Sequence, residues 1–176
     1  MSYLIIGYSG VTPYRKWITS LLLLPFAFYF ILNWGRYTLI DNTNLIIHEA
    51  GHFFFSFLGN FIQAAGGTLM QIFFPLFIAF YFFRSGYRTG VQIFIFWLGQ
   101  NLINISVYAA DAQLRNLPLL GKGKHDWYYM LKELALLEQT EIFGYLFFLA
   151  GILTIILSLI LPLFLDEQYP LPSRVS

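Results

Sequence analysis

The feature that most constrains this fold is a series of long apolar stretches that carry little charge. Most of them approach the roughly 20 residues that a helix needs to cross the hydrocarbon core of a bilayer. We expect helices at residues 17–34, 43–61, 69–83, 91–110 and 141–165. The sequence therefore predicts an all-α integral membrane protein, a single-domain bundle of four to five membrane helices.

The composition supports the same class. Apolar residues make up 58% of the chain and charged residues 11%, well below the charged share of a soluble domain. Ten basic and nine acidic residues give a net charge of +1, so no nucleic-acid partner is expected. The absence of cysteine excludes disulfides, thiolate metal ligands and a cysteine nucleophile. The expected surroundings of the chain are membrane lipids.

The first and third apolar stretches need individual interpretation. Trp17 and Trp34 flank the first stretch as interface anchors, and no small-residue cleavage site follows it, so we expect a retained helix rather than a signal peptide. Before the third stretch, Gly66-Gly67 is expected to break the chain, with room for a short hairpin there. Residues 69–83 are few for a span and contain Pro75, so this segment is either a tilted span or a re-entrant one. Residues 111–139 form the one long polar connection, and the tail 166–176 is expected to be extended.

The second apolar stretch contains the string His48-Glu49-Ala50-Gly51-His52. On a helix, this spacing places two imidazoles one turn apart on the same face, where both can bind one zinc ion. Glu49 lies between them and can take a proton from water at the metal. The sequence therefore predicts a Zn2+ site with His48 and His52 as ligands and Glu49 as the catalytic base. The structural alternative is a pair of buried histidines bonded to backbone, with an ordinary glutamate between them.

A third ligand is expected because catalytic zinc usually has three protein ligands and one open position. The fourth stretch carries a polar stripe on one helix face: Asn101, Asn104, Tyr108 and Asp111. A polar stripe on a membrane helix faces other protein or a water-filled cavity. We rank Asp111 first as the third ligand, with Asn101, Asn104 and Tyr108 expected around substrate or ligands; hydrogen bonding between helices is the alternative for the amides.

Two residues of the polar connection compete for the same role. His125 is the second candidate for the third ligand. Asp126 is ranked third, with a role as an orienting partner of a ligand as another possibility. The structural alternative is a loop histidine followed by Asp126 as the N-cap of a helix from Trp127 to Leu137.

These residues resemble those of the site-2 protease family of intramembrane zinc metallopeptidases. The resemblance covers roughly residues 44–121 and includes Gly66-Gly67-Thr68, which is similar to a glycine-rich segment of that family. It implies that His48 and His52 bind zinc, that Glu49 is the base and that a carboxylate completes the site. It also implies a membrane peptide or protein substrate, and the compact pattern is most similar to membrane proteins of the bacterial inner membrane.

The chain departs from the family in its second motif, which normally reads Asn-x-x-Pro-x-x-x-Leu-Asp-Gly. Residues 116–121 keep an Asn, a Pro and a Gly but have no Asp before the Gly. The choice of Asp111 therefore depends on the polar stripe. It also requires the helices of His48 and Asp111 to run antiparallel. Either the 69–83 segment is re-entrant, or the ligands lie nearer mid-depth, or His48 and His52 have another partner.

Two functions are consistent with the sequence. The first is a membrane-embedded zinc hydrolase, most simply an intramembrane endopeptidase. The second is a non-catalytic accessory or structural subunit of a larger membrane complex, with a vestigial or structural metal site.

Overall fold

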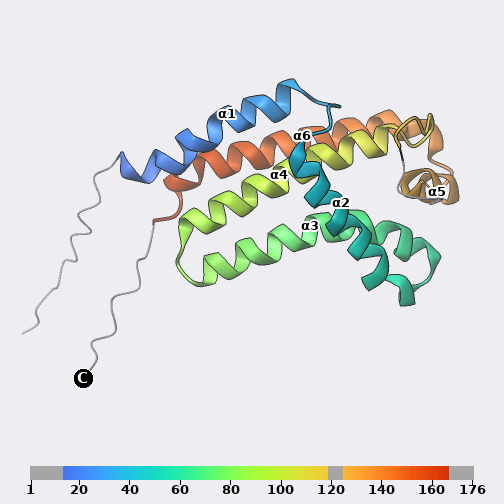
Figure 1. The fold of residues 1–176 in the computed structure, drawn as a ribbon, viewed down its shortest axis with the longest axis horizontal. Helices are drawn as coiled ribbons and strands as arrows, with labels where there is room; N and C mark the ends of the chain where they lie inside the picture. The colour runs from blue at the N-terminus through green and yellow to red at the C-terminus, as the bar shows by residue number, and fades with distance from the viewer. Residues whose placement is uncertain (1–13, 119–124, 167–176) are drawn as a thin grey trace, which may run out of the picture.

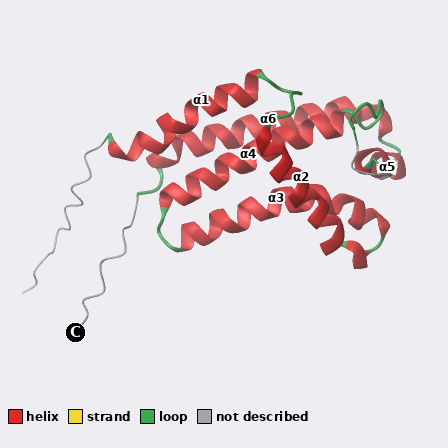
Figure 2. Cartoon of the chain, in the orientation of Figure 1, coloured by secondary structure: helices red, strands yellow, loops and turns green. Residues whose placement is uncertain are grey.

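The structure is a computed structural model in which residues 14–118 and 125–166 are described. These residues form six α-helices and no strand (Figure 2). The helices are α1 (Ile18–Leu32), α2 (Leu39–Phe54), α3 (Asn60–Arg84), α4 (Arg88–Ala110), α5 (Asp126–Glu133) and α6 (Thr140–Ile160). Single 3-10 turns lie at Arg15–Trp17, Ser56–Leu58, Leu137–Gln139 and Leu161–Leu163.

Four helical segments are long and apolar enough to cross a membrane: Arg15–Leu32, Asn60–Arg84, Arg88–Ala110 and Leu137–Leu163. They contain α1, α3, α4 and α6, which lie side by side along the long axis of the molecule (Figure 1). The 16-residue helix α2 crosses this bundle obliquely, and α5 lies at one end of it. The predicted all-α membrane bundle is confirmed.

Polar side chains are buried in this bundle while large apolar ones are exposed. The side chains of Asn44, Gln92, Asn101 and Ser106 are fully buried. Exposed leucines and phenylalanines occur along α1, α3 and α6. This distribution suits a lipid environment, where apolar side chains face the lipid tails and polar side chains form hydrogen bonds with one another inside the protein.

Helix α3 differs from the sequence expectation. It is continuous over 25 residues, includes Gly66, Gly67 and Pro75, and is long enough for a full span rather than a re-entrant segment. The glycine pair neither breaks the chain nor opens a hairpin. It provides a smooth surface against α2, because a Cβ at Gly66 would lie 2.7 Å from the carbonyl oxygen of Gly51. From the sequence alone, a glycine pair predicts a break in a helix. In a membrane bundle, the same pair allows two helices to pack closely.

The second helix is also shorter than the expected 43–61. It starts earlier, at a capping box in which Thr38 is the N-cap and Asp41 the N3 residue, and it ends at Phe54. The chain then turns through a 3-10 segment to Gly59, whose φ of 89° favours glycine, and enters α3. Gly59 therefore separates α2 from α3 within the stretch 43–61, which the apolar pattern predicted to be one helix.

The position of α2 explains how the two candidate site helices meet without being antiparallel. Asn44 bonds to Trp97 near the middle of α4, and His48 lies against the ring of Tyr108 near the C-terminal end of α4. The two helices therefore advance in the same direction, and α2 begins at mid-depth. Helix α3 can therefore span the membrane completely while α2 and α4 run in the same direction, because α2 extends along only part of the bundle.

Candidate metal centre

Two histidines of α2 and one aspartate of α5 converge at one end of the bundle. Oδ2 of Asp126 lies 3.1 Å from Nε2 of His48 and 3.2 Å from Nε2 of His52. The ligand atoms of these three side chains all lie within 4.8 Å of one another. Among the described residues they are the only group of three or more His, Asp or Glu side chains that could hold a metal ion.

The spacing of these atoms fits a tetrahedral metal. Ligand atoms at about 2.0–2.1 Å from a central zinc are separated by about 3.3–3.4 Å along each tetrahedral edge. The two nitrogen-to-oxygen distances of 3.1 and 3.2 Å are close to that separation. The third separation, between the ligand atoms of His48 and His52, is within 4.8 Å.

The other ring nitrogens are held by oxygen atoms of α3. Nδ1 of His52 lies 2.8 Å from the carbonyl oxygen of Gln63, and Nδ1 of His48 lies 2.9 Å from Oε1 of Gln71. A carbonyl oxygen only accepts hydrogen bonds, so each Nδ1 carries a proton. In a neutral ring Nε2 then presents its lone pair to Asp126. A lone pair facing a carboxylate oxygen requires a cation between them, either a proton or a metal ion.

Without a metal ion, protonation of His52 meets that requirement. The hydrogen bond to Asp126 raises the pKa of His52 to about 9, although burial of the ring acts in the opposite direction. Burial would raise the pKa of Asp126, but hydrogen bonds from His48 and His52 outweigh it and lower the pKa to about 2. In the metal-free site the Asp126 carboxylate is thus paired with the His52 cation, whose place a metal ion could take.

Asp126 is placed by the start of α5. His125 is the N-cap of this helix, since its Nδ1 accepts a hydrogen bond from the backbone N–H of Tyr128 at 3.2 Å. Asp126 is therefore not the N-cap, and α5 ends at Glu133 rather than near Leu137. Because the histidine caps the helix, the carboxylate of Asp126 is free to reach the histidines of α2.

Tyr108 of α4 fixes the same carboxylate. Its hydroxyl donates to Oδ2 of Asp126 at 3.2 Å and accepts from the backbone N–H of Asp126 at 3.1 Å. The α5 helix is anchored by the buried side chains of Trp127, Met130 and Leu131, which pack on α4 residues such as Ile105. The third ligand position therefore depends on tertiary packing of a short helix.

Asp111, ranked first from the sequence, lies elsewhere. Its two carboxylate oxygens accept from the backbone N–H groups of Asn116 and Leu117 at 2.9 and 3.0 Å. Its Oδ2 lies 3.4 Å from Nε2 of His125, near enough for an ion pair although no hydrogen bond forms. Burial lowers the pKa of His125. Asp111 and His125 thus hold the 111–118 loop and the start of α5, and neither belongs to the His48/His52/Asp126 group. Residues 119–121 of the second family motif lie outside the described residues.

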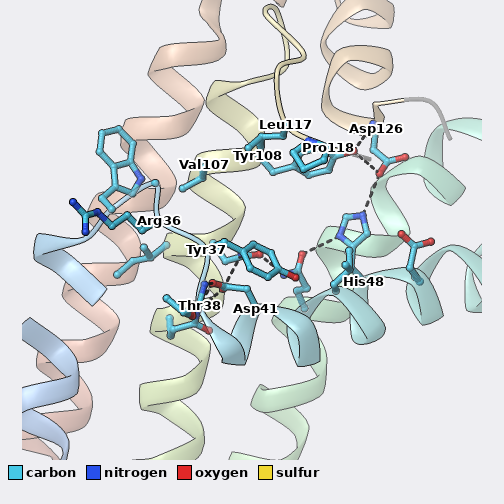
Figure 3. A pocket seen from close by; sticks show the side chains of 18 of the residues that line it. Arg36, Tyr37, Thr38, Asp41, His48, Val107, Tyr108, Leu117, Pro118 and Asp126 are labelled. Carbon is cyan, nitrogen blue, oxygen red and sulfur yellow. Dashed lines mark hydrogen bonds and ion pairs between the residues drawn. The ribbon is translucent and has the colours of Figure 1, made fainter. Parts of the chain in front are cut away.

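A cavity of about 580 Å3 opens beside the histidines, a volume in the range of ligand pockets (Figure 3). It extends from the α1–α2 connection at Arg36 to the loop at Leu117 and Pro118. Glu49 lines it with an exposed side chain.

The polar stripe of α4 divides between the cavity and the protein interior. Asn104 and Tyr108 line the cavity, whereas Asn101 is fully buried and its amide donates to the backbone oxygen of Trp97. The sequence analysis missed Gln71 and Asp41, whose side chains form hydrogen bonds with the amide of Asn104. Their signal was a polar residue inside an apolar stretch and a carboxylate at a helix start.

Comparison of the chain with known protein families, with characterised proteins and with solved structures found no match. The geometry of the site is therefore the main evidence for the function of this chain.

Proposed function

We propose that this chain is a membrane-embedded zinc-dependent hydrolase, most simply an endopeptidase that acts on membrane peptides or proteins. The observation that carries the proposal is the convergence of His48, His52 and Asp126 beside an exposed glutamate in a cavity. His48, His52 and Asp126 would hold the ion, which leaves the cavity side for water and substrate. Two histidines and one carboxylate are a ligand set of catalytic zinc. The resemblance to the site-2 protease family supports the same reading.

Zinc in this position would supply a Lewis acid that acidifies water and polarises a carbonyl group. Glu49 follows His48 in α2 and its carboxylate lines the same cavity. It would accept the proton of the attacking water and deliver a proton to the leaving amine. The amide of Asn104 and the hydroxyl of Tyr108, both on the cavity wall, would bound the substrate on the α4 side.

The shape of the cavity supports a substrate that enters along the membrane edge. Its walls come from α1 to α5, the α1–α2 connection and the 117–118 loop. Tyr108 lies near the end of α4, so the site is close to the end of a spanning segment rather than at its middle. A peptide bond at the end of a substrate's membrane segment would reach this position, and we place the protein in the bacterial inner membrane on the family resemblance.

A non-catalytic role of the same group is the second candidate. The His52–Asp126 ion pair compensates the buried charge without any ion, so the group is internally satisfied. In that case the site would bind a structural metal, or none, within a larger membrane complex.

Two variants separate these functions. The protein is purified in mild detergent, its zinc content is measured by mass spectrometry, and cleavage of fluorescent casein and of a labelled single-span peptide is followed. His52→Ala is expected to lose zinc and cleavage. Glu49→Gln is expected to keep zinc and to lose cleavage by a factor of about 100 or more. Zinc binding with no Glu49-dependent cleavage would favour the structural role, and no zinc in the wild-type protein would contradict both metal-based functions.

A further inference from the structure

The cavity beside the metal group has a polar wall and an apolar wall, and both include residues of α4 (Figure 3). Gln100, Asn104 and Tyr108 follow one another at intervals of four residues and line the cavity on the side of α2 and α3. Ile103 and Val107, also four residues apart, line it on the side of α1. Residues four apart in a helix lie on one face, so α4 presents a polar row beside an apolar row.

The apolar wall continues from α4 to α1 and to the connection that follows α1. Phe30 of α1 packs against the core cluster that contains Ile103, and Trp34 lies in the connection; both line the cavity. The indole N–H of Trp34 donates to the hydroxyl oxygen of Ser106 at 2.8 Å, and its ring stacks on Phe148 with a centroid separation of 4.8 Å. The indole is therefore held in place, and the wall presents a defined shape to a ligand.

The amides of the polar wall already have partners within the protein. The nitrogen of Asn104 donates to Asp41 at 3.0 Å, and its oxygen accepts from Gln71 at 2.9 Å. The nitrogen of Gln100 donates to Asp41 at 2.8 Å, and its oxygen accepts from Asn44 at 2.7 Å. A substrate therefore gains little by replacing these partners. The apolar wall differs, because any substrate group that covers it removes apolar surface from contact with water.

The apolar wall begins beside the metal group and extends toward the middle of the bundle. Val107 precedes Tyr108, whose hydroxyl bonds to Asp126, and Ile103 lies one helical turn further from that end of α4. At 1.5 Å per residue, Ile103 is about 6 Å from Val107 along the helix axis. An extended peptide advances about 3.3 Å per residue, so this length corresponds to about two residues. Successive side chains of an extended chain point to opposite sides, so one of these two residues faces the wall.

We propose that Val107 and Ile103 form a subsite for a large apolar side chain, such as leucine or phenylalanine, one or two residues from the bond that is cleaved on its membrane side. This inference rests on the proposed function and deepens it by naming the side chain that the site selects. Ile103 is 5% exposed and belongs to the core, whereas Val107 is only half-buried. Val107 is therefore the residue that a substrate side chain meets first and the one that determines the size accepted.

The first test measures binding at this wall without cleavage. The chain has no cysteine, so Val107→Cys in the Glu49→Gln protein places a single thiol on the cavity wall. The rate at which a maleimide modifies this thiol is measured with increasing amounts of acetylated Ser-Gly-X-Gly-Ser, in which X is leucine, phenylalanine or alanine. The leucine and phenylalanine peptides are expected to protect the thiol at concentrations about 10-fold or more below that of the alanine peptide. Ile93→Cys, on an exposed position of α4 outside the cavity, is the control and should show no protection.

The second test measures cleavage. The bond cut in the labelled single-span peptide is mapped by mass spectrometry, and the two neighbouring residues on its membrane side are set in turn to leucine or alanine. Wild-type protein is expected to cleave one of the leucine peptides with a kcat/KM about 10-fold or more above that of its alanine counterpart. Val107→Phe fills the subsite and is expected to remove this preference by lowering kcat/KM for the leucine peptide. Ile93→Phe adds bulk to α4 outside the cavity and should keep the preference.

The two tests separate the subsite from the proposed hydrolase. Protection of Val107→Cys that depends on side-chain size, in a protein that cleaves no peptide, would support the subsite and contradict the hydrolase. Protection that is equal for the leucine and alanine peptides, or absent with both, would overturn the subsite, as would equal cleavage of both. If Val107→Phe does not fold, Val107→Ala enlarges the subsite and is expected to raise kcat/KM for a phenylalanine peptide relative to the leucine peptide. An unchanged ratio would count against the role of Val107.

Discussion

Nε2 of His48 and Oδ2 of Asp126 lie 3.1 Å apart although 78 residues separate them in the sequence. The contact joins a helix that begins at mid-depth in the bundle to a short helix at its end. It also places a carboxylate where the His-Glu-x-x-His string needs a third ligand. The chemistry of the site therefore depends on how α5 is docked.

The first prediction separates the two candidate carboxylates. Asp126→Asn is expected to reduce zinc affinity by 10-fold or more, because a neutral amide replaces a charged ligand between His48 and His52. Asp111→Asn is expected to keep wild-type affinity, because Asp111 bonds to backbone N–H groups of the 116–117 loop. Competition with a zinc chelator measures both. Zinc loss in Asp111→Asn with retention in Asp126→Asn would reverse the assignment.

The second prediction concerns the pH dependence of metal binding. With a pKa of about 9 in the metal-free protein, His52 must release a proton when it becomes a ligand. Zinc affinity is therefore expected to rise about tenfold per pH unit below pH 9 and to level off above it. Chelator competition at several pH values between 6.5 and 8.5 measures the slope. An affinity that does not change over this range would show that no proton is displaced.

The same pKa values set the stability of the metal-free protein. The raised pKa of His52 contributes stability below its ordinary value of 6.5, and this contribution is lost as pH rises through about 9. The lowered pKa of Asp126 contributes stability above the ordinary value of 3.8, and this is lost as pH falls through about 2. The unfolding temperature of metal-free protein is thus expected to fall as the pH rises from 6.5 to about 9 and to level off above that pH. Asp126→Asn removes the partner and should abolish the alkaline shift.

The third prediction tests the contact between α2 and α3. A Cβ at Gly67 would overlap the imidazole of His48. Gly67→Ala is expected to displace that ring and to weaken zinc binding by 10-fold or more. The matched control is Gly90→Ala, where the new methyl group meets the ring of Phe82 instead, at the start of α4 and outside the metal group. Wild-type zinc affinity in Gly67→Ala would mean that His48 is not held in the observed position.

The fourth prediction tests the anchoring of α5. Leu131 is 1% exposed, and Leu131→Ala is expected to destabilise the fold by about 2–5 kcal/mol and to weaken zinc binding. Leu134 lies three residues further along and is 53% exposed, so Leu134→Ala should change neither quantity. Thermal unfolding and chelator competition on both variants measure the difference. Equal zinc affinity in the two would show that the position of Asp126 does not depend on packing of this helix.

The sequence by itself determined the class of the fold and two members of the candidate metal group. Hydropathy over about 20 residues decides whether a helix can span a bilayer, and this property is local to each stretch. The spacing of His48 and His52 is equally local, because any helix through both residues places them on one face. These features could be read without knowing how the helices pack.

Only the tertiary structure decided the third carboxylate and the course of α2 and α3. Asp111 and Asp126 are both polar residues beside a membrane helix, and no local pattern tells which one approaches the histidines. The answer depends on the capping of α5 by His125 and on the packing of Leu131. Gly66-Gly67 likewise predicts a helix break from the sequence, yet in the structure it allows α3 to pack closely against Gly51 of α2. Contacts between segments distant in sequence decide such features, because their energies depend on which surfaces meet.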